Sequence, residues 1–206
     1  MKVVIAEKPS VARDLARVMG AKEVKDGYIE GNGYAFTYAF GHLVQLCTPQ
    51  TYGYLNWAVS NLPIIPTDFQ LEVKKVKRDG KQSDDLGALK QLNIIKLLLD
   101  KAEEIIVATD AGREGELIFR NIYYYLQSNV PFKRLWISSQ TDKAIKEGFA
   151  KLKEGREYDS LYMSARSRSE SDWLIGINAT QALTLAAGNR GLLCSRNNSQ
   201  IYFIHY

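Results

Sequence analysis

The sequence predicts an α/β fold with a mainly parallel sheet, followed by the start of an α-helical domain. Two short apolar runs rich in β-branched residues, 2–6 and 104–109, are typical of buried strands. Each run is followed by a charged turn and then by apolar residues at helical spacing. Strands that alternate with helices imply a parallel sheet with right-handed crossovers. No proline occurs from residue 158 to residue 187, which predicts one or two long helices there.

The first strand, Lys2 to Ala6, ends in the charged turn Glu7-Lys8-Pro9-Ser10. Pro9 suits the first position of a helix, and Gly20 is a natural place for that helix to end. Residues 28–40 alternate in polarity and are flanked and interrupted by glycines, which predicts a hairpin. A carboxylate, that of Glu7, therefore stands at the carboxyl end of the first strand.

Residues 49–69 are interpreted as a loop that carries the aromatic side chains Tyr52, Tyr54 and Trp57. Aromatic side chains can stack on nucleobases, but they can equally pin a long loop onto its domain. His42, which precedes this loop, is a single histidine, and such residues are more often structural than catalytic.

The second half of the α/β region continues the alternation of helices and strands. Clustered bases between Leu71 and Lys81 can neutralise phosphates, although a run of charges is more often a solvated face. An amphipathic helix at 89–99 leads into the strand at 104–109, and a second helix has its apolar face between residues 117 and 126. A strand at 134–138 and a helix capped by Thr141 complete the pattern.

The stretch Thr109 to Glu116 directly follows the second strand and carries three carboxylates. In open α/β sheets, ligands bind beyond the carboxyl ends of the strands. Mg²⁺ usually takes one or two carboxylates together with phosphate or water. The alternative is an ordinary helix start, because acidic residues are favoured in a first turn. If the two strands are neighbours, Glu7 and Asp110 converge, which favours the metal site.

The composition is that of a soluble globular protein, with 206 residues of which 46% are hydrophobic and 24% charged. No apolar run reaches the length of a membrane span and no signal peptide is evident, which predicts a cytoplasmic protein without a membrane partner. Cys47 and Cys194 lie far apart, without partners at metal-ligand spacing, which argues against a zinc site and a disulfide framework. A net charge of +4 permits a nucleic-acid partner without requiring one.

Five segments, taken together, resemble the type IA DNA topoisomerases, and among these the bacterial topoisomerase III group. The segments follow the family order and spacing, and they are Ala6 to Ser10, Phe40 to Leu43, Leu62-Pro63 with Pro66, Thr109 to Glu116, and Asp172 to Asn178. The resemblance runs from Met1 to about Gly191. It implies a Toprim domain with a Rossmann-like sheet at residues 1–150. The start of a helical domain that binds single-stranded DNA would follow at 151–191, and an atypical tail at 192–206.

The resemblance also implies roles for particular residues. Glu7 and Lys8 match catalytic positions, with Lys8 beside the scissile phosphate, and the implied Mg²⁺ ligands are Glu7, Asp110 and Glu114. Arg168 matches an arginine that contacts DNA near the cleaved bond. The full candidate DNA-binding set is Trp57, Arg166, Arg168 and Asp172. The implied protein is a monomer of the bacterial cytoplasm, associated with the nucleoid, that uses Mg²⁺ but no organic cofactor and acts on single-stranded DNA.

Two departures from the family pattern stand out. The Toprim pattern commonly has Asp-x-Asp before Arg-Glu-Gly, and here Gly112 replaces the second Asp. After Gly191 the family continues with a Gly-Arg-Val-Gln-Thr-Pro segment, whereas Leu192 to Tyr206 has the character of a frameshifted or prematurely ended tail. Tyr202 and Tyr206 lack the family context of the nucleophilic tyrosine, and neither is assigned that role.

The activity implied by the resemblance is the Mg²⁺-dependent cutting and rejoining of single-stranded DNA. A tyrosine oxygen attacks a phosphodiester, another strand passes through the gap, and the break is resealed. Because the segment with the tyrosine is not in this sequence, we expect the 206-residue polypeptide to be inactive by itself. Two alternatives stay open, namely a Toprim-type metal-dependent nuclease and a non-enzymatic, truncated fragment that binds DNA.

Overall fold

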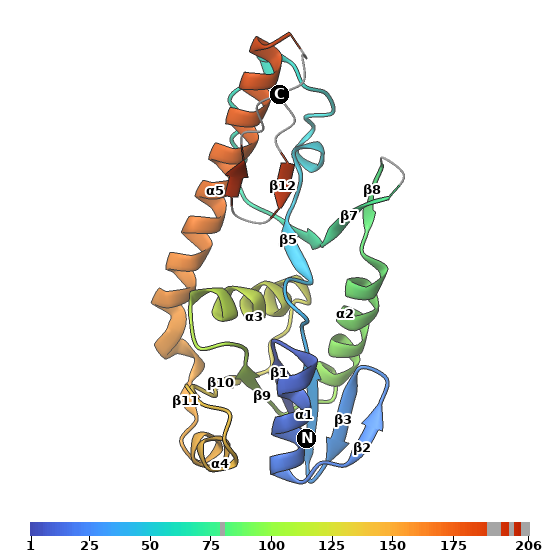
Figure 1. The fold of residues 1–206 in the computed structure, drawn as a ribbon, viewed down its shortest axis with the longest axis vertical. Helices are drawn as coiled ribbons and strands as arrows, with labels where there is room; N and C mark the ends of the chain where they lie inside the picture. The colour runs from blue at the N-terminus through green and yellow to red at the C-terminus, as the bar shows by residue number, and fades with distance from the viewer. Residues whose placement is uncertain (79–80, 189–194, 198–199, 203–206) are drawn as a thin grey trace. The chain divides into compact units, whose positions relative to one another are not determined.

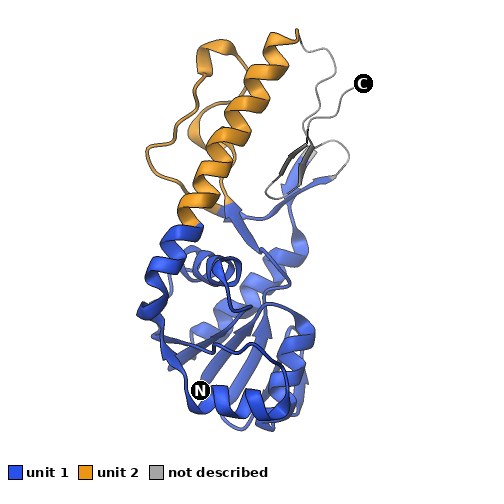
Figure 2. Cartoon of the chain, turned by 60° about the vertical axis from the view of Figure 1, so that its left-hand side comes forward, with its two compact units in different colours: residues 1–45, 72–165 blue, residues 46–71, 166–206 orange. Residues whose placement is uncertain are grey.

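The computed structural model of the protein describes residues 1–78, 81–188, 195–197 and 200–202. The chain divides into unit 1, formed by residues 1–45 and 72–165, and unit 2, formed by residues 46–71 and 166–206 (Figure 2). Among the described residues, the main sheet lies in unit 1 and has seven strands. Their spatial order is β11 (Lys153–Glu154), β10 (Phe132–Arg134), β9 (Glu104–Ala108), β1 (Lys2–Ala6), β4 (Tyr34–Tyr38), β3 (Tyr28–Gly31) and β2 (Glu23–Lys25) (Figure 1).

The centre of this sheet is parallel, as the sequence predicts. Strand β1 pairs in parallel with β9 on one side and with β4 on the other, and β10 pairs in parallel with β9. Antiparallel pairs occur only toward the two edges, where β3 pairs with β4 and β2 with β3, and β11 with β10. The predicted hairpin at 28–40 is therefore confirmed as β3 and β4.

Three of the four helices that lie within unit 1 have a capping residue at one end. Helix α1 (Pro9–Met19) ends at Gly20, whose φ of 81° is left-handed. Helix α2 (Leu86–Leu99) begins earlier than predicted because the Asp85 side chain accepts hydrogen bonds from two backbone amides of its first turn. The others are α3 (Arg113–Tyr125) and α4 (Asp142–Ala150), and Thr141 caps α4 as predicted.

The strand predicted at 134–138 is wrong in its bounds, since β10 covers Phe132–Arg134. The apolar residues after Arg134 have high strand propensity. However, the backbone N–H of Leu135 donates to the Val107 carbonyl, and the neighbouring strand β9 ends at Ala108. Trp136 and Ile137 therefore have no strand to pair with.

The core of unit 1 lies against both faces of the sheet. On one face, apolar side chains of β1, β4 and β9 pack against α1 and α4, and this cluster includes Val4, Phe36, Ile106, Leu15 and Ile145. Residues that alternate with these along the strands, such as Val3 and Ile5, are also fully buried. Strands buried on both faces are typical of a parallel sheet.

Unit 2 consists of an irregular segment and most of a long helix. Helix α5 (Asp159–Ala186) is one continuous helix of 28 residues, which settles the choice between one and two predicted helices. The predicted loop contains only two short 3₁₀ turns, η1 (Pro49–Tyr52) and η2 (Val59–Asn61). None of the helices in the described part of the chain is long and apolar enough to cross a membrane.

The remaining elements are short. Strands β5 (Val44–Leu46) and β6 (Leu71–Val73) pair, β7 (Lys75–Arg78) and β8 (Lys81–Asp84) form a hairpin, and η3 (Gly155–Tyr158) precedes α5. In the predicted tail, β12 (Ser195–Asn197) pairs with β13 (Gln200–Tyr202), and residues 192–194, 198–199 and 203–206 lie outside the described residues.

Candidate metal centre

The carboxyl ends of the two neighbouring parallel strands β1 and β9 lie side by side at one edge of the sheet. Strand β1 leads to Glu7 and β9 leads to Asp110, and the last paired residues of the two strands, Ala6 and Ala108, are directly opposite each other. The two acidic residues therefore converge, and Glu7 Oε2 accepts a hydrogen bond from the backbone N–H of Asp110 at 3.1 Å. The prediction that Glu7 and Asp110 converge required the two strands to be neighbours, and β1 and β9 are neighbours.

Lys8 adds a cation to this pair of carboxylates. It is the N-cap residue of α1, and its Nζ lies 3.3 Å from Asp110 Oδ2. Both side chains are more than half exposed, so water screens the attraction and the pair contributes little to stability. An exposed lysine in such a weak ion pair can exchange its carboxylate partner for a phosphate.

Glu114 stands in the first turn of α3, and it contacts His42 rather than Glu7 or Asp110. The Nε2 atom of His42 lies 2.5 Å from Glu114 Oε1. His42 comes from the segment between β4 and β5, so the contact joins residues 72 positions apart. The role of His42 could not be predicted from the sequence, because a single histidine gives no local indication of its partner.

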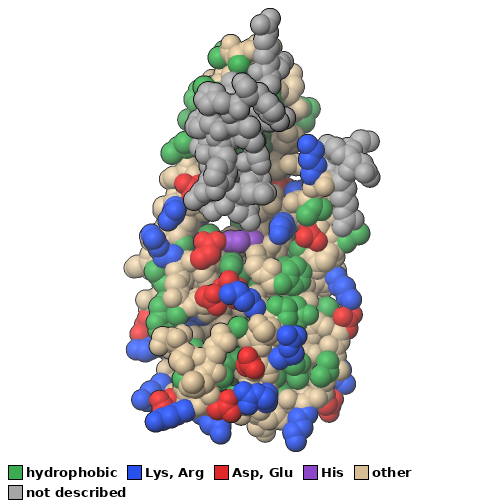
Figure 3. Space-filling model, in the orientation of Figure 1, with side chains coloured by type: hydrophobic (Ala, Val, Ile, Leu, Met, Phe, Trp, Pro, Cys, Tyr) green, Lys and Arg blue, Asp and Glu red, His purple; other side chains and the backbone are tan. Residues whose placement is uncertain are grey.

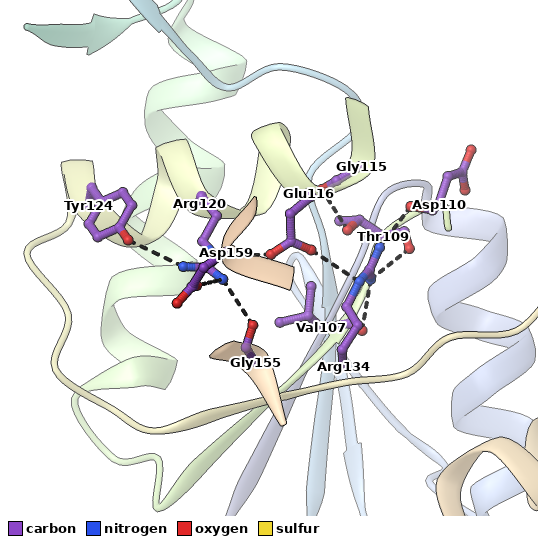
Figure 4. A network of polar contacts seen from close by, with 10 residues as sticks. All are labelled: Val107, Thr109, Asp110, Gly115, Glu116, Arg120, Tyr124, Arg134, Gly155 and Asp159. Carbon is purple, nitrogen blue, oxygen red and sulfur yellow. Dashed lines mark hydrogen bonds and ion pairs between the residues drawn. The ribbon is translucent and has the colours of Figure 1, made fainter. Parts of the chain in front are cut away.

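Buried charges hold the turn that carries Asp110 (Figure 4). The Arg134 guanidinium donates hydrogen bonds to the carbonyls of Val107, Thr109 and Asp110 at 3.0, 2.9 and 2.8 Å. Arg134 Nε also forms an ion pair with Glu116 Oε2 at 3.2 Å. Burial lowers the pKa of Arg134, and the nearby negative charge of Glu116 opposes that shift.

Glu116 and Arg120 extend this network away from the turn. Arg120 Nε donates to Glu116 Oε1 at 2.9 Å, and Arg120 Nη2 reaches Asp159 Oδ1 at 2.6 Å (Figure 4). Glu116 is completely buried. It was counted among the three carboxylates of the acidic stretch, but its oxygens face two arginines and it does not belong to the exposed acidic edge.

Gly115 allows the turn to close tightly. A Cβ atom at this position would lie 2.1 Å from the Asp110 carbonyl oxygen, which no side chain could tolerate without a shift of the backbone. Thr109 Oγ1 donates to the Gly115 carbonyl at 2.7 Å and closes the same turn from the other side. By contrast, nothing lies within 4 Å of a Cβ placed on Gly112.

The acidic edge suits a hard cation that keeps part of its water. Within the described residues, no group of three or more His, Cys, Asp or Glu side chains converges closely enough to hold a metal alone. Glu7 and Asp110 do supply two neighbouring carboxylates, which is the number that Mg²⁺ commonly takes when phosphate or water completes its shell. The assignment of Glu114 as a ligand stays a prediction.

The candidate DNA-binding residues belong to unit 2. Trp57 is 47% exposed in the loop. On α5, Arg166 and Arg168 each form an ion pair through Nε with the acidic side chain four residues further on. Arg166 reaches Glu170 at 2.6 Å and Arg168 reaches Asp172 at 3.7 Å. On the face shown in Figure 3, basic and acidic side chains alternate instead of forming one large basic patch. The DNA-binding assignments stay predictions.

Of the aromatic residues in the loop, Tyr52 pins the loop in place. Its ring packs edge-on against Trp173, and its hydroxyl accepts a hydrogen bond from the backbone N–H of Gln70 at 2.9 Å. For this residue the structural alternative raised by the sequence is confirmed.

Comparisons with known proteins agree on the family. The family model described as "Toprim domain" matches residues 2–140. The chain is 54% identical over 196 residues to DNA topoisomerase 3 of Bacillus cereus, covering 94% of this chain and 26% of the relative. It is 50% identical over 198 residues to DNA topoisomerase 3 of Bacillus subtilis, with the same coverage of 94% and 26%. The chain thus spans about a quarter of the length of these curated relatives.

A solved structure shares the fold. Full-length topoisomerase I from Thermotoga maritima superposes with a TM-score of 0.57 at 20% identity, covering 88% of this chain and 26% of that one.

Proposed function

This chain belongs to the Toprim domain family, and from that membership we propose that it forms the N-terminal part of a type IA DNA topoisomerase of the topoisomerase III kind. Such an enzyme cuts and rejoins single-stranded DNA to change DNA topology. The observation that carries the proposal is the convergence of Glu7, Lys8 and Asp110 at the carboxyl edge of the parallel sheet. The similarity over 94% of the chain supports it.

Each residue of the edge has a proposed task. Lys8 binds the scissile phosphate and stabilises the charge that develops on its oxygens. Glu7 donates a proton to the leaving 3′-oxygen and recovers it during resealing. Asp110 and Glu114 hold a divalent cation, with Mg²⁺ as the proposed ion. Glu7 contributes a third carboxylate once it has given its proton to the 3′-oxygen. A bound Mg²⁺ supplies positive charge to the phosphate and helps to hold the broken strand.

Unit 2 is proposed to bind the DNA strand. Arg166 and Arg168 can exchange their partners on the helix for phosphates, because an exposed i,i+4 ion pair is worth only about 0.3–0.5 kcal/mol. Trp57, exposed in the loop, offers a face on which a base can stack. Asp172 orients Arg168. We further propose a monomer that acts in the bacterial cytoplasm at the nucleoid.

A chimeric enzyme tests this function. Residues 1–191 of this chain replace the matching segment of Bacillus cereus DNA topoisomerase 3, and relaxation of a negatively supercoiled plasmid is measured with Mg²⁺. We expect relaxation by the chimera and none by its Asp110→Asn variant. The 206-residue chain alone is expected to give no relaxation, because it spans only about a quarter of the length of that enzyme.

The same assay separates the alternatives. A folded chimera that leaves the plasmid supercoiled would contradict the proposal. Accumulation of nicked plasmid that is never resealed, produced by the 206-residue chain with Mg²⁺, would favour the metal-dependent nuclease. Binding of single-stranded DNA without any strand cleavage by the chimera would favour a non-enzymatic role.

A further inference from the structure

We propose that His42 is a positioning residue of the acidic edge, which fixes Glu114 through a hydrogen bond and so prepares it for cation binding. This inference rests on the proposed function, because it concerns the same site. It starts from the contact between His42 Nε2 and Glu114 Oε1. An ionised carboxylate only accepts hydrogen bonds, so the imidazole donates through Nε2. One oxygen of Glu114 is then held by His42, and the other stays available to a cation.

The backbone that presents His42 is strained. Phe40 has a φ of 33° and Gly41 a φ of 90°, so two consecutive residues are left-handed. A phenylalanine rarely adopts such a φ, and strained residues of this kind are retained where the surrounding structure holds them. Phe40 is also an exposed residue, so burial of its own side chain does not account for the conformation. The turn instead places His42, two residues after Phe40, next to the start of α3.

Both ends of this turn are anchored in unit 1. The backbone N–H of Ala39 donates to the Ala6 carbonyl at 2.9 Å, and that of Lys74 donates to the Leu43 carbonyl at 2.9 Å. Ala6 immediately precedes Glu7, so the hydrogen bond that fixes the turn also fixes the strand end that carries the first carboxylate. The same backbone hydrogen bonds therefore fix the turn that carries His42 and the strand end that carries Glu7.

The side chains of Glu114 and His42 differ in their exposure to solvent. The Glu114 side chain is 70% exposed, whereas that of His42 is 25% exposed. An exposed glutamate in a first helical turn has several rotamers open to it in water. A hydrogen bond from a more buried donor selects among them, and hydrogen bonds of this type to carboxylate ligands orient them for the metal. Removing such partners typically costs about 10–100-fold in metal affinity.

The test is a double-mutant cycle on the 206-residue chain, read out by calorimetric titration with Mg²⁺. We expect His42→Ala to weaken Mg²⁺ binding by about 10–100-fold. His42→Gln keeps an N–H donor and is expected to recover most of the loss. In a Glu114→Gln background, His42→Ala should have no further effect, because the partner is already changed. Asp142→Asn, which alters the exposed pair with Arg17 on α4, serves as the matched control.

Two outcomes overturn the inference on its own. One is an unchanged Mg²⁺ affinity in His42→Ala when Asp110→Asn has lost binding. The other is an equal loss on His42→Ala with and without Glu114→Gln, which would show a general structural effect. If neither the unmodified chain nor the Asp110→Asn variant binds Mg²⁺, the proposed metal site itself is wrong, and the role proposed for His42 is wrong with it.

Discussion

Arg134 illustrates how one buried side chain can set the shape of a site that it does not enter. Its guanidinium donates to three backbone carbonyls around the end of β9, those of Val107, Thr109 and Asp110. Unpaired charges are costly to bury. Glu116 meets this requirement from α3, and so ties the helix to the turn. The exposed Asp110 carboxylate thus stands on a backbone that buried charges fix.

The tight turn at Gly115 leaves no room for a side chain. Gly115→Ala should lower the free energy of unfolding by about 1–3 kcal/mol, because the new methyl group forces the backbone of Asp110 to move. Urea unfolding followed by circular dichroism measures the change. Gly112→Ser, in the same turn, is the control, since its Cβ meets nothing within 4 Å. Equal stability of Gly115→Ala and the unmodified chain would show that the turn is not as tight as described.

Glu104 gives a pH-dependent prediction. Burial raises the pKa of this carboxyl, but Lys2 and Lys133, at 3.0 and 3.2 Å, outweigh burial and leave the pKa below its ordinary value. A carboxyl whose pKa is lowered by folding stabilises the folded state above its unfolded pKa of about 4.3. That contribution is lost as the pH falls through the lowered folded value.

The variant Glu104→Gln tests this linkage. We expect it to unfold at lower urea concentration than the unmodified chain at pH 7, and the gap between the two should narrow as the pH falls below about 4. Denaturation midpoints across this pH range provide the measurement. A gap that stays constant from neutral to acidic pH would refute the assignment of the ion pairs.

At the scale of elements, two residues of α5 organise the loop of unit 2. The Trp173 indole N–H donates to the Cys47 carbonyl at 2.9 Å, and its ring meets Tyr52 and Phe69 edge-on. Five residues later, the Asn178 side chain forms two hydrogen bonds with the backbone of Ile64, in the manner of a neighbouring strand. A loop without regular structure is thus fixed by one helix.

Asn178→Ala should loosen that loop. The N–H and C=O of Ile64, a fully buried residue, would lose their partner, which typically costs about 1–3 kcal/mol. Hydrogen exchange should rise in residues 47–70 and stay unchanged in β1. Ile175→Ala, at a 61% exposed position on the same helix, is the matched control and should leave exchange as it is. Unchanged protection of the loop in Asn178→Ala would contradict this role.

The elements that could be predicted from the sequence are those with a repeating pattern. The apolar runs of β1 and β9 and the helical spacing of α1 and α3 indicate their own structure. Residues 135–137 have the propensity of a strand, but the partner strand ends first, and a strand needs a partner. The hydrogen bonds between Asn178 and Ile64 join residues 114 positions apart, and no local sequence pattern indicates such a contact.

In the molecule as a whole, the acidic edge could be predicted from the sequence, but the residues that support it could not. Glu7 and Asp110 were predictable because each directly follows a buried strand. His42 was not predictable, because its partner depends on the strained turn at Phe40 and on the placement of α3. The buried positions of Arg134 and Glu116 could not be predicted, because charged residues are rarely buried. In the sequence Glu116 belongs to the acidic stretch, and only the structure shows that it pairs with arginines. The edge lies in unit 1 and the candidate DNA-binding residues lie in unit 2.

We propose that the carboxyl edge of the parallel sheet binds a divalent cation through Glu7 and Asp110. Calorimetric titration of the 206-residue chain with Mg²⁺ measures this binding. We expect weak binding by the unmodified chain, and a loss of affinity of at least about 10-fold in both Glu7→Gln and Asp110→Asn. The Asp142→Asn control should bind as the unmodified chain does. The same Mg²⁺ affinity in Asp110→Asn as in the unmodified chain would contradict the claim.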